Sequence, residues 1–192
     1  MSAHAPLGFD DRLPLLGIAA WSGTGKTTLL ERLLPALEGR GLRTAVIKHA
    51  HHGFDVDQPG KDSHRLRQAG AAPMLVASRA RWALMMETPG QREADLAQLV
   101  EMVRPLWPDL VLVEGFKAWP LPKLELYREE VGKPLRVAGD PWVKAVASVP
   151  AVAVPEGVDS LPLDDVEAIA DWVAAWPARW PAEQRPRGVI GP

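Results

Sequence analysis

The segment AWSGTGKTT, residues 20–28, constrains this chain more than any other. It follows the apolar run 15–19 and opens a leucine-rich stretch with helical spacing. The apolar run predicts a buried strand, and the glycines predict a turn whose N–H groups point inward. The helix that follows places its partial positive charge at the same cavity. The segment therefore predicts a phosphate-binding loop between a strand and a helix.

The consensus for such a loop is G-x-x-x-x-G-K-[ST], and Ala20 stands where the first glycine is expected. Gly23 and Gly25 still supply permissive backbone positions. Lys26 is expected to reach the β and γ phosphates, and the Thr27 hydroxyl to ligate Mg²⁺. A glycine-rich turn that binds nothing is the alternative, but the strand and helix context favours the phosphate loop. The predicted nucleotide-binding residues are Ser22, Gly23, Thr24, Gly25, Lys26, Thr27 and Thr28.

Apolar runs alternate with amphipathic stretches along the rest of the chain. The helix after the loop is expected to end near Gly39 or Gly41, and a short helix to run from Asp62 or Ser63 to near Gly70. Two further helices are predicted at 96–103 and 163–173, and strands at 44–48, 74–77, 81–88, 110–113, 123–127 and 142–148. This pattern predicts an α/β fold of the P-loop NTPase type. It has a mostly parallel sheet flanked by helices and a small β-hairpin extension, made by 74–77 and 81–88.

The length of 192 residues suits one domain. We expect that domain to span 13–176, with irregular termini at 1–12 and 177–192. The second of these carries Pro177, Pro181, Pro186 and Pro192, and repeated proline disfavours regular structure.

Composition narrows the function classes. The net charge of −2 gives no overall basic field for nucleic acid or an anionic membrane. The chain has no cysteine, which excludes disulfides, thiolate metal sites and a cysteine nucleophile. No run approaches the roughly 20 apolar residues of a membrane span. We therefore expect a cytoplasmic protein with no nucleic-acid partner and no membrane attachment.

A phosphate loop needs a metal-associated carboxylate at the end of a neighbouring strand. Glu114 directly follows the apolar strand residues of DLVLVEGFK, residues 109–117, and Gly115 permits a sharp exit beside it. We predict that Glu114 is the catalytic acid, associated with Mg²⁺ or with the attacking water. A strand-end carboxylate facing solvent is the alternative. Asp109, at the opposite end of the strand, is expected to be a structural turn residue.

The segment 48–67 is dense in Lys, His and Asp, and it follows the carboxyl end of a strand. This composition suits a polar lid over phosphates, in which Asp55, Asp57 and Asp62 could contact Mg²⁺ and Lys48 and Lys61 could contact anions. A polar loop without such contacts is the alternative. The histidines suggest a zinc or nickel site, but the set lacks a fourth ligand. These histidines are His49, His51 and His52.

The segment PKLELYR, residues 122–128, alternates polar and apolar side chains. Lys123 and Arg128 could hold a second phosphorylated ligand, or the polar side chains could form a solvated strand face. The chain has eight tryptophans. Trp21 lies inside the phosphate loop, and the other seven are expected to serve packing or interfaces.

Together, AWSGTGKTT, the histidine–aspartate segment ending in GKDS, VEGFK, PKLELYR and LDDVEAIADWV resemble the molybdopterin-guanine dinucleotide biosynthesis protein B family. The resemblance spans roughly 15–173 and keeps the motif order. It implies a P-loop NTPase fold that binds GTP with Mg²⁺, hydrolyses it weakly and forms homodimers through an extended β element. It also implies an accessory role beside the molybdenum cofactor guanylyltransferase that attaches GMP to molybdopterin, with direct molybdopterin binding left open.

Residue by residue, the resemblance assigns the phosphate cradle to Gly23, Gly25, Lys26, Thr27 and Thr28, and the metal site to Thr27 and Glu114. Its second signature contains His51, Asp57, Lys61 and Asp62. The chain has no asparagine and hence no N-K-x-D guanine motif, so guanine preference rests on the resemblance. A P-loop small-molecule kinase and a metal-insertion GTPase are the alternative functions.

Overall fold

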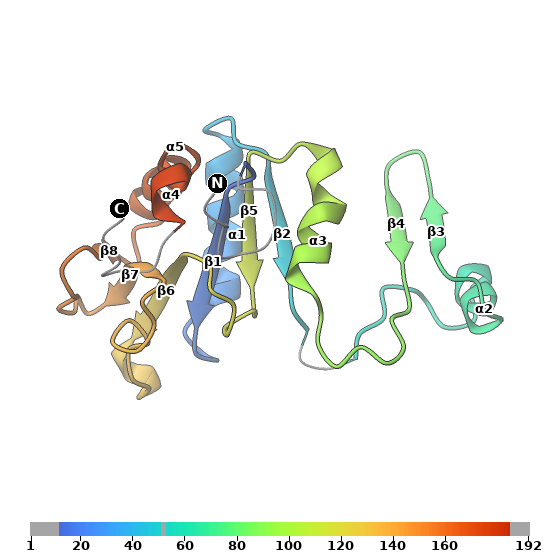
Figure 1. Cartoon of the computed structure of the whole chain (residues 1–192), viewed down its shortest axis with the longest axis horizontal. Coiled ribbons are helices and arrows are strands. Elements are labelled where there is room, and N and C mark those ends of the chain that lie inside the picture. Colours follow the sequence, from blue (N-terminus) through green and yellow to red (C-terminus); the bar gives the residue numbers. More distant parts are fainter. Residues whose placement is uncertain (1–11, 51–52, 185–192) are drawn as a thin grey trace, which may run out of the picture. The chain divides into compact units, whose positions relative to one another are not determined.

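A computed structural model describes residues 12–50 and 53–184 (Figure 1). The chain divides into two compact units. The first takes in the chain up to His49 and from Asp95 onward, and the second is Ala50–Ala94. The span 13–176, expected as one domain, thus contains two compact units.

The first unit is built on a six-stranded parallel sheet in the order β2-β5-β1-β6-β7-β8. Apolar, β-branched strands such as β5 are buried, as expected in the middle of a parallel sheet. Because the strands are parallel, the carboxyl ends of β1, β5 and β6 meet at one edge. The strands are β1 Leu15–Ala20, β2 Thr44–Lys48, β5 Leu110–Glu114, β6 Lys123–Arg128, β7 Val143–Val149 and β8 Asp159–Pro162.

The described residues of this unit form four α-helices. Its α1 follows β1 along the chain (Figure 1). The buried residues of α1 are Leu29, Leu30, Leu33 and Leu37, which lie on the predicted leucine face. Asp165 caps α4 by accepting a hydrogen bond from the Ala168 N–H, so this helix begins after the predicted position 163. The helices are α1 Lys26–Glu38, α3 Leu96–Val103, α4 Val166–Ala174 and α5 Trp176–Glu183, with short 3-10 turns η1 Arg104–Leu106 and η2 Glu129–Val131.

The prediction of an irregular tail from 177 is wrong for 177–183, which belong to α5. Trp176 and Trp180 are buried, and the indole N–H of Trp176 donates to the Leu15 carbonyl of β1 at 2.9 Å. Pro177 lies in the first turn, where a helix has no partner for its N–H groups. Two buried indoles one helical turn apart thus hold the segment on the sheet. The other predicted irregular stretches, 1–11 and 185–192, lie outside the described residues.

The alternative of a solvated strand face in 122–128 is also wrong for Lys123 and Glu125. β6 lies between β1 and β7, and Lys123 and Glu125 are 3% and 0% exposed. The Lys123 ammonium donates to the Trp119 carbonyl at 2.9 Å and lies 3.0 Å from the Asp140 carboxylate. Burial lowers the pKa of Lys123, and the hydrogen bond to Asp140 opposes that shift. The polar side chains of β6 therefore have partners inside the protein.

The second unit contains α2 Asp62–Gln68 and an antiparallel hairpin of β3 Met74–Ala77 and β4 Trp82–Met85. The hairpin confirms the predicted β extension, although its second strand is shorter than 81–88. Leu75 pairs with Leu84 across the hairpin, and both are exposed in the chain. Across both units, the described residues contain no helix long and apolar enough to cross a membrane.

Candidate functional site

The loop between β1 and α1 has the backbone that its sequence predicts. Gly23 and Gly25 take φ values of 86° and 91°, which residues with a Cβ adopt at a cost. Thr24 between them is buried, and its hydroxyl donates to the Trp21 carbonyl at 2.9 Å. This bond closes the loop on itself. Thr24 is therefore a structural member of the loop rather than an exposed one.

The start of α1 presents free hydrogen-bond donors to the same space. Gly25 is the N-cap residue, no side chain caps the helix, and its first turn contains no acidic residue. The first N–H groups of a helix have no partner within it, and they carry the positive end of the helix dipole. Ser22, Thr27 and Thr28 are exposed around this end. The arrangement is suited to binding a multiply charged anion such as a phosphate chain.

Glu114 lies beside Lys26, as strand polarity predicts. Its carboxylate is 3.1 Å from the Lys26 ammonium and 3.8 Å from that of Lys48, the last residue of β2. The register explains this convergence, because Glu114 pairs with Ile18 of β1 and with Lys48 of β2. The Glu114 side chain is 13% exposed. The structure thus brings together the predicted acid and the predicted phosphate-binding lysine.

Gly115 lets the chain turn sharply after Glu114. Its φ is 95°, and a Cβ there would lie 2.9 Å from the Cβ of His49. The His49 N–H donates to the Glu114 carbonyl at 2.8 Å, and the His49 ring stacks on Phe116 with centroids 5.0 Å apart. The end of β2 and the end of β5 are therefore packed closely at Glu114.

The Thr27 hydroxyl and the Glu114 carboxylate match the oxygen ligands that Mg²⁺ takes beside nucleotide phosphates. No group of three or more His, Cys, Asp or Glu residues among those described could hold a metal by itself, so phosphate and water oxygens would complete the shell. For the predicted zinc or nickel site, His49 is engaged with Phe116. His51 and His52 lie outside the described residues.

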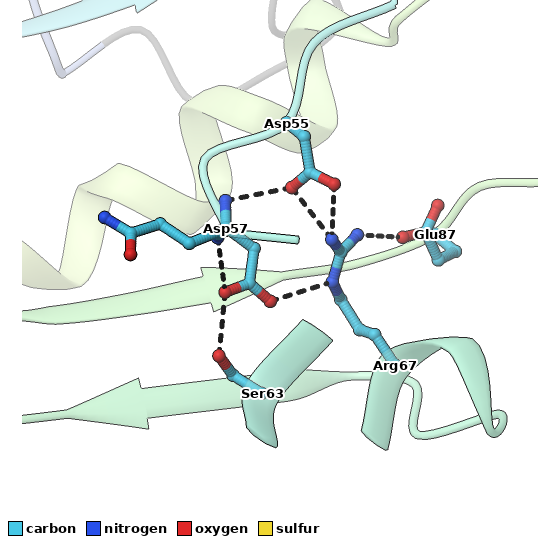
Figure 2. A network of polar contacts seen from close by, with 6 residues as sticks. Asp55, Asp57, Ser63, Arg67 and Glu87 are labelled. Atoms are coloured by element: carbon cyan, nitrogen blue, oxygen red, sulfur yellow. Dashed lines mark hydrogen bonds and ion pairs between the residues drawn. The ribbon is translucent and has the colours of Figure 1, made fainter. Parts of the chain in front are cut away.

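The second predicted signature lies in the second unit, and Arg67 organises it (Figure 2). Its guanidinium donates to Asp55 at 2.6 and 2.8 Å and to Glu87 at 2.7 Å, and it lies 3.5 Å from Asp57. The Ser63 hydroxyl donates to the other oxygen of Asp57 at 2.7 Å. The N–H of Asp57 and then Arg67 lower the pKa of Asp55. In this structure these two carboxylates bind Arg67 and backbone rather than projecting as free metal ligands.

The other members of the second signature are less enclosed. Lys61 is the N-cap residue of α2 and Asp62 lies in the first turn, and both are exposed. His51 lies outside the described residues.

Lys123 and Arg128, predicted for a second phosphorylated ligand, have different surroundings. Lys123 is buried against Asp140, so it is not available to a ligand in this structure. Arg128 lies against the phosphate loop, where its Nε donates to the Thr24 carbonyl at 3.2 Å. Its Nη2 donates to Asp164 at 2.8 Å. Arg128 therefore braces the loop from the end of β6.

The sequence analysis missed the contacts that Trp21 makes from within the loop. The Trp21 indole N–H donates to the Pro134 carbonyl at 2.9 Å, and the Arg136 guanidinium lies over its ring, 4.1 Å from the centroid. The buried carboxylate of Glu125 accepts hydrogen bonds from the Arg136 and Val137 N–H groups at 2.7 and 2.9 Å. The position of Trp21 inside the loop was the available signal, whereas nothing local marks Arg136.

A family model described as "Molybdopterin guanine dinucleotide synthesis protein B" matches residues 15–149, the span that carries the phosphate loop, Glu114 and β6. The chain belongs to this family. Its similarity to the molybdopterin-guanine dinucleotide biosynthesis adapter protein of Escherichia coli (strain K12) is 52% identity over 164 residues, which covers 84% of this chain and 91% of the relative. The adapter protein of the same name from Haemophilus influenzae is 43% identical over 164 residues, covering 85% and 89%.

Solved structures of the family agree with the fold. A crystal structure of molybdopterin-guanine biosynthesis protein B matches with a TM-score of 0.67 at 28% identity, covering 85% of this chain and 99% of the other. The crystal structure of Bacillus subtilis MobB matches with a TM-score of 0.66 at 27% identity, covering 85% and 98%. The predicted family and the P-loop type of α/β fold are therefore confirmed.

Proposed function

We propose that this chain is a GTP-binding adapter protein in molybdopterin guanine dinucleotide biosynthesis, and that it hydrolyses GTP weakly with Mg²⁺. The observation that carries the nucleotide site is the pairing of Lys26 with Glu114 at 3.1 Å beside an uncapped helix N-terminus. The adapter role follows the printed names of the relatives. GTP rather than ATP follows the family resemblance.

Each side chain of the site has one task in this proposal. The loop N–H groups and Lys26 bind the phosphates, and Lys26 exchanges Glu114 for phosphate oxygens when nucleotide enters. Glu114, released from Lys26, then faces Mg²⁺ or the attacking water. Mg²⁺ would be held by Thr27 and Glu114 and would neutralise charge on the phosphates. In this proposal Glu114 alone orients the attacking water, so we expect hydrolysis to be slow.

Two substitutions separate binding from hydrolysis. Lys26→Ala should weaken GTP binding by about 100-fold, because it removes a charge-assisted contact to the phosphates. Glu114→Gln should bind GTP within about threefold of wild type but hydrolyse it at least tenfold more slowly, a modest loss for a general base. Isothermal titration and single-turnover phosphate release measure the two effects.

Glu38→Gln, at the far end of α1, is the matched control and should change neither quantity. Wild-type turnover by the Glu114→Gln variant would disprove the role of Glu114 and leave the binding assignment intact.

We also propose that the chain acts in the cytoplasm as a homodimer, with the β3–β4 hairpin in the interface. Two-stranded hairpins are marginal alone in water. Here Leu75, Trp82 and Leu84 are 58%, 58% and 41% exposed in the single chain. An apolar surface of this kind on a small antiparallel sheet is typical of an interaction site. The molybdenum cofactor guanylyltransferase is the proposed partner enzyme of the dimer.

A further inference from the structure

Arg136 is held in place by the backbone, and its Nε has no hydrogen-bond partner among the described residues. It lies on the connection between β6 and β7, and its N–H is bound by the buried carboxylate of Glu125. Glu125 pairs with Ala19 of β1, immediately before the phosphate loop. The position of Arg136 is therefore set by the strand next to the loop.

The Arg136 side chain lies over the ring of Trp21, a residue of the phosphate loop. Its guanidinium is 4.1 Å from the centroid of the Trp21 ring, and Trp21 in turn holds the Pro134 carbonyl. A guanidinium carries five N–H donors. Within the described part of the chain, none of them donates a hydrogen bond or forms an ion pair, and Nε is shielded from solvent without a partner. A stacked arginine with unused donors is arranged to bind a planar or tetrahedral oxyanion.

Lys117 adds a second cation to the same place. It follows Glu114 on the loop after β5, and its side chain is exposed. Partial burial lowers the pKa of Lys117, and the positive charges of Arg136 and Lys26 lower it further. Lys117 is therefore within electrostatic range of both Arg136 and Lys26. The carboxylate of Glu114 is already shared by Lys26 and Lys48.

We propose that Arg136 and Lys117 form a phosphate subsite beside the phosphate loop, which binds one phosphate group. The bound group is either the terminal phosphate of the nucleotide or the phosphate of a second ligand. The subsite builds on the proposed nucleotide binding, but it rests on different residues. Trp21 links the two, since it belongs to the loop and supports Arg136.

The test uses Arg136→Met, which keeps an aliphatic chain over Trp21 and the N–H bound by Glu125. Lys133→Met, an exposed residue of the same connection, is the matched control, and Lys117→Met is a second variant of the subsite. Thermal melts establish that each variant folds. Isothermal titration then measures GTP, GDP and, in the GDP-loaded protein, inorganic phosphate.

If the subsite takes the terminal phosphate, Arg136→Met and Lys117→Met should each bind GTP about tenfold more weakly and GDP within about twofold of wild type. If it takes the phosphate of a second ligand, both nucleotides should bind normally, and inorganic phosphate should bind the GDP-loaded variants about tenfold more weakly.

If the wild-type protein bound neither GTP nor GDP, the proposed function would be refuted. Titration of inorganic phosphate into the free protein would then test the subsite by itself. Equal affinities of wild type, Arg136→Met, Lys117→Met and Lys133→Met for every ligand tested would overturn the subsite.

Discussion

Single residues at the carboxyl edge of the sheet decide the geometry of this site. Gly115 is the clearest case, because its backbone has a φ of 95° and its Cα faces the backbone and Cβ of His49. The lack of a side chain there lets β2 and β5 end side by side. That closeness places Lys48 of β2 near Glu114, which also lies beside Lys26.

Gly115→Ala should therefore lower the free energy of unfolding by about 3 kcal/mol, from a left-handed backbone and a crowded Cβ together. Gly157→Ala is the matched control, since Gly157 has a φ of 78° but nothing within 4 Å of a Cβ. It should cost only about 1 kcal/mol. Urea denaturation measures both values. A Gly115→Ala variant no less stable than Gly157→Ala would refute the packing argument.

Glu125 makes stability depend on pH. Burial raises its pKa above the ordinary 4.5, and the hydrogen bonds from the N–H groups of Arg136 and Val137 oppose that shift. The folded state thus holds the proton more tightly than the unfolded state does. The stability that protonation of Glu125 contributes is fully present below pH 4.5 and is lost as the pH rises through the folded pKa.

Glu125→Gln removes this titration and leaves one backbone N–H facing an amide donor. It should cost about 1–3 kcal/mol at neutral pH. The free energies of unfolding of wild type and variant are measured from pH 4 to pH 7. As the pH rises, the wild type should lose stability relative to the variant. Parallel pH profiles of the two proteins would show that Glu125 has the same pKa folded and unfolded.

At the level of elements, local patterns predicted most of this structure. The glycines and Lys26 lie in one short motif, and the position of Glu114 follows from the polarity of one strand, so both could be placed from the sequence. The burial of β6 could not be predicted in this way. Lys123 forms an ion pair with Asp140, and Glu125 accepts hydrogen bonds from the N–H groups of Arg136 and Val137. These partners lie 11 to 17 residues further along the chain.

The same reasoning explains the error at α5 and the contacts in the second signature that the sequence did not predict. Prolines in 177–181 suggested irregular chain, but the partner of Trp176 is the Leu15 carbonyl at the other end of the sequence. The sequence suggested Mg²⁺ contacts for Asp55 and Asp57, and it gives no indication that Arg67, which also binds Glu87, lies against both of them (Figure 2). Local composition does not reveal such long-range partners.

At the scale of the whole molecule, the exposed hairpin predicts the oligomeric state. Leu75→Lys should convert the proposed dimer to a monomer, because it places a charge on an apolar surface that association would bury. Leu106→Lys is the control. Leu106 lies on η1 and is 55% exposed, close to the 58% of Leu75. Sedimentation velocity should show a dimer for the wild type and for Leu106→Lys, and a monomer for Leu75→Lys. A monomeric wild type would refute the dimer.

The central claim is that this chain binds GTP through the loop at residues 20–28. Isothermal titration of the purified protein with GTP and with ATP, each with and without Mg²⁺, tests it most directly. We predict one GTP per chain, bound at least about tenfold more tightly than ATP and more tightly with Mg²⁺, with binding about 100-fold weaker in Lys26→Ala. Equal affinity for ATP would contradict the guanine assignment, and the absence of any heat from either nucleotide would contradict the claim itself.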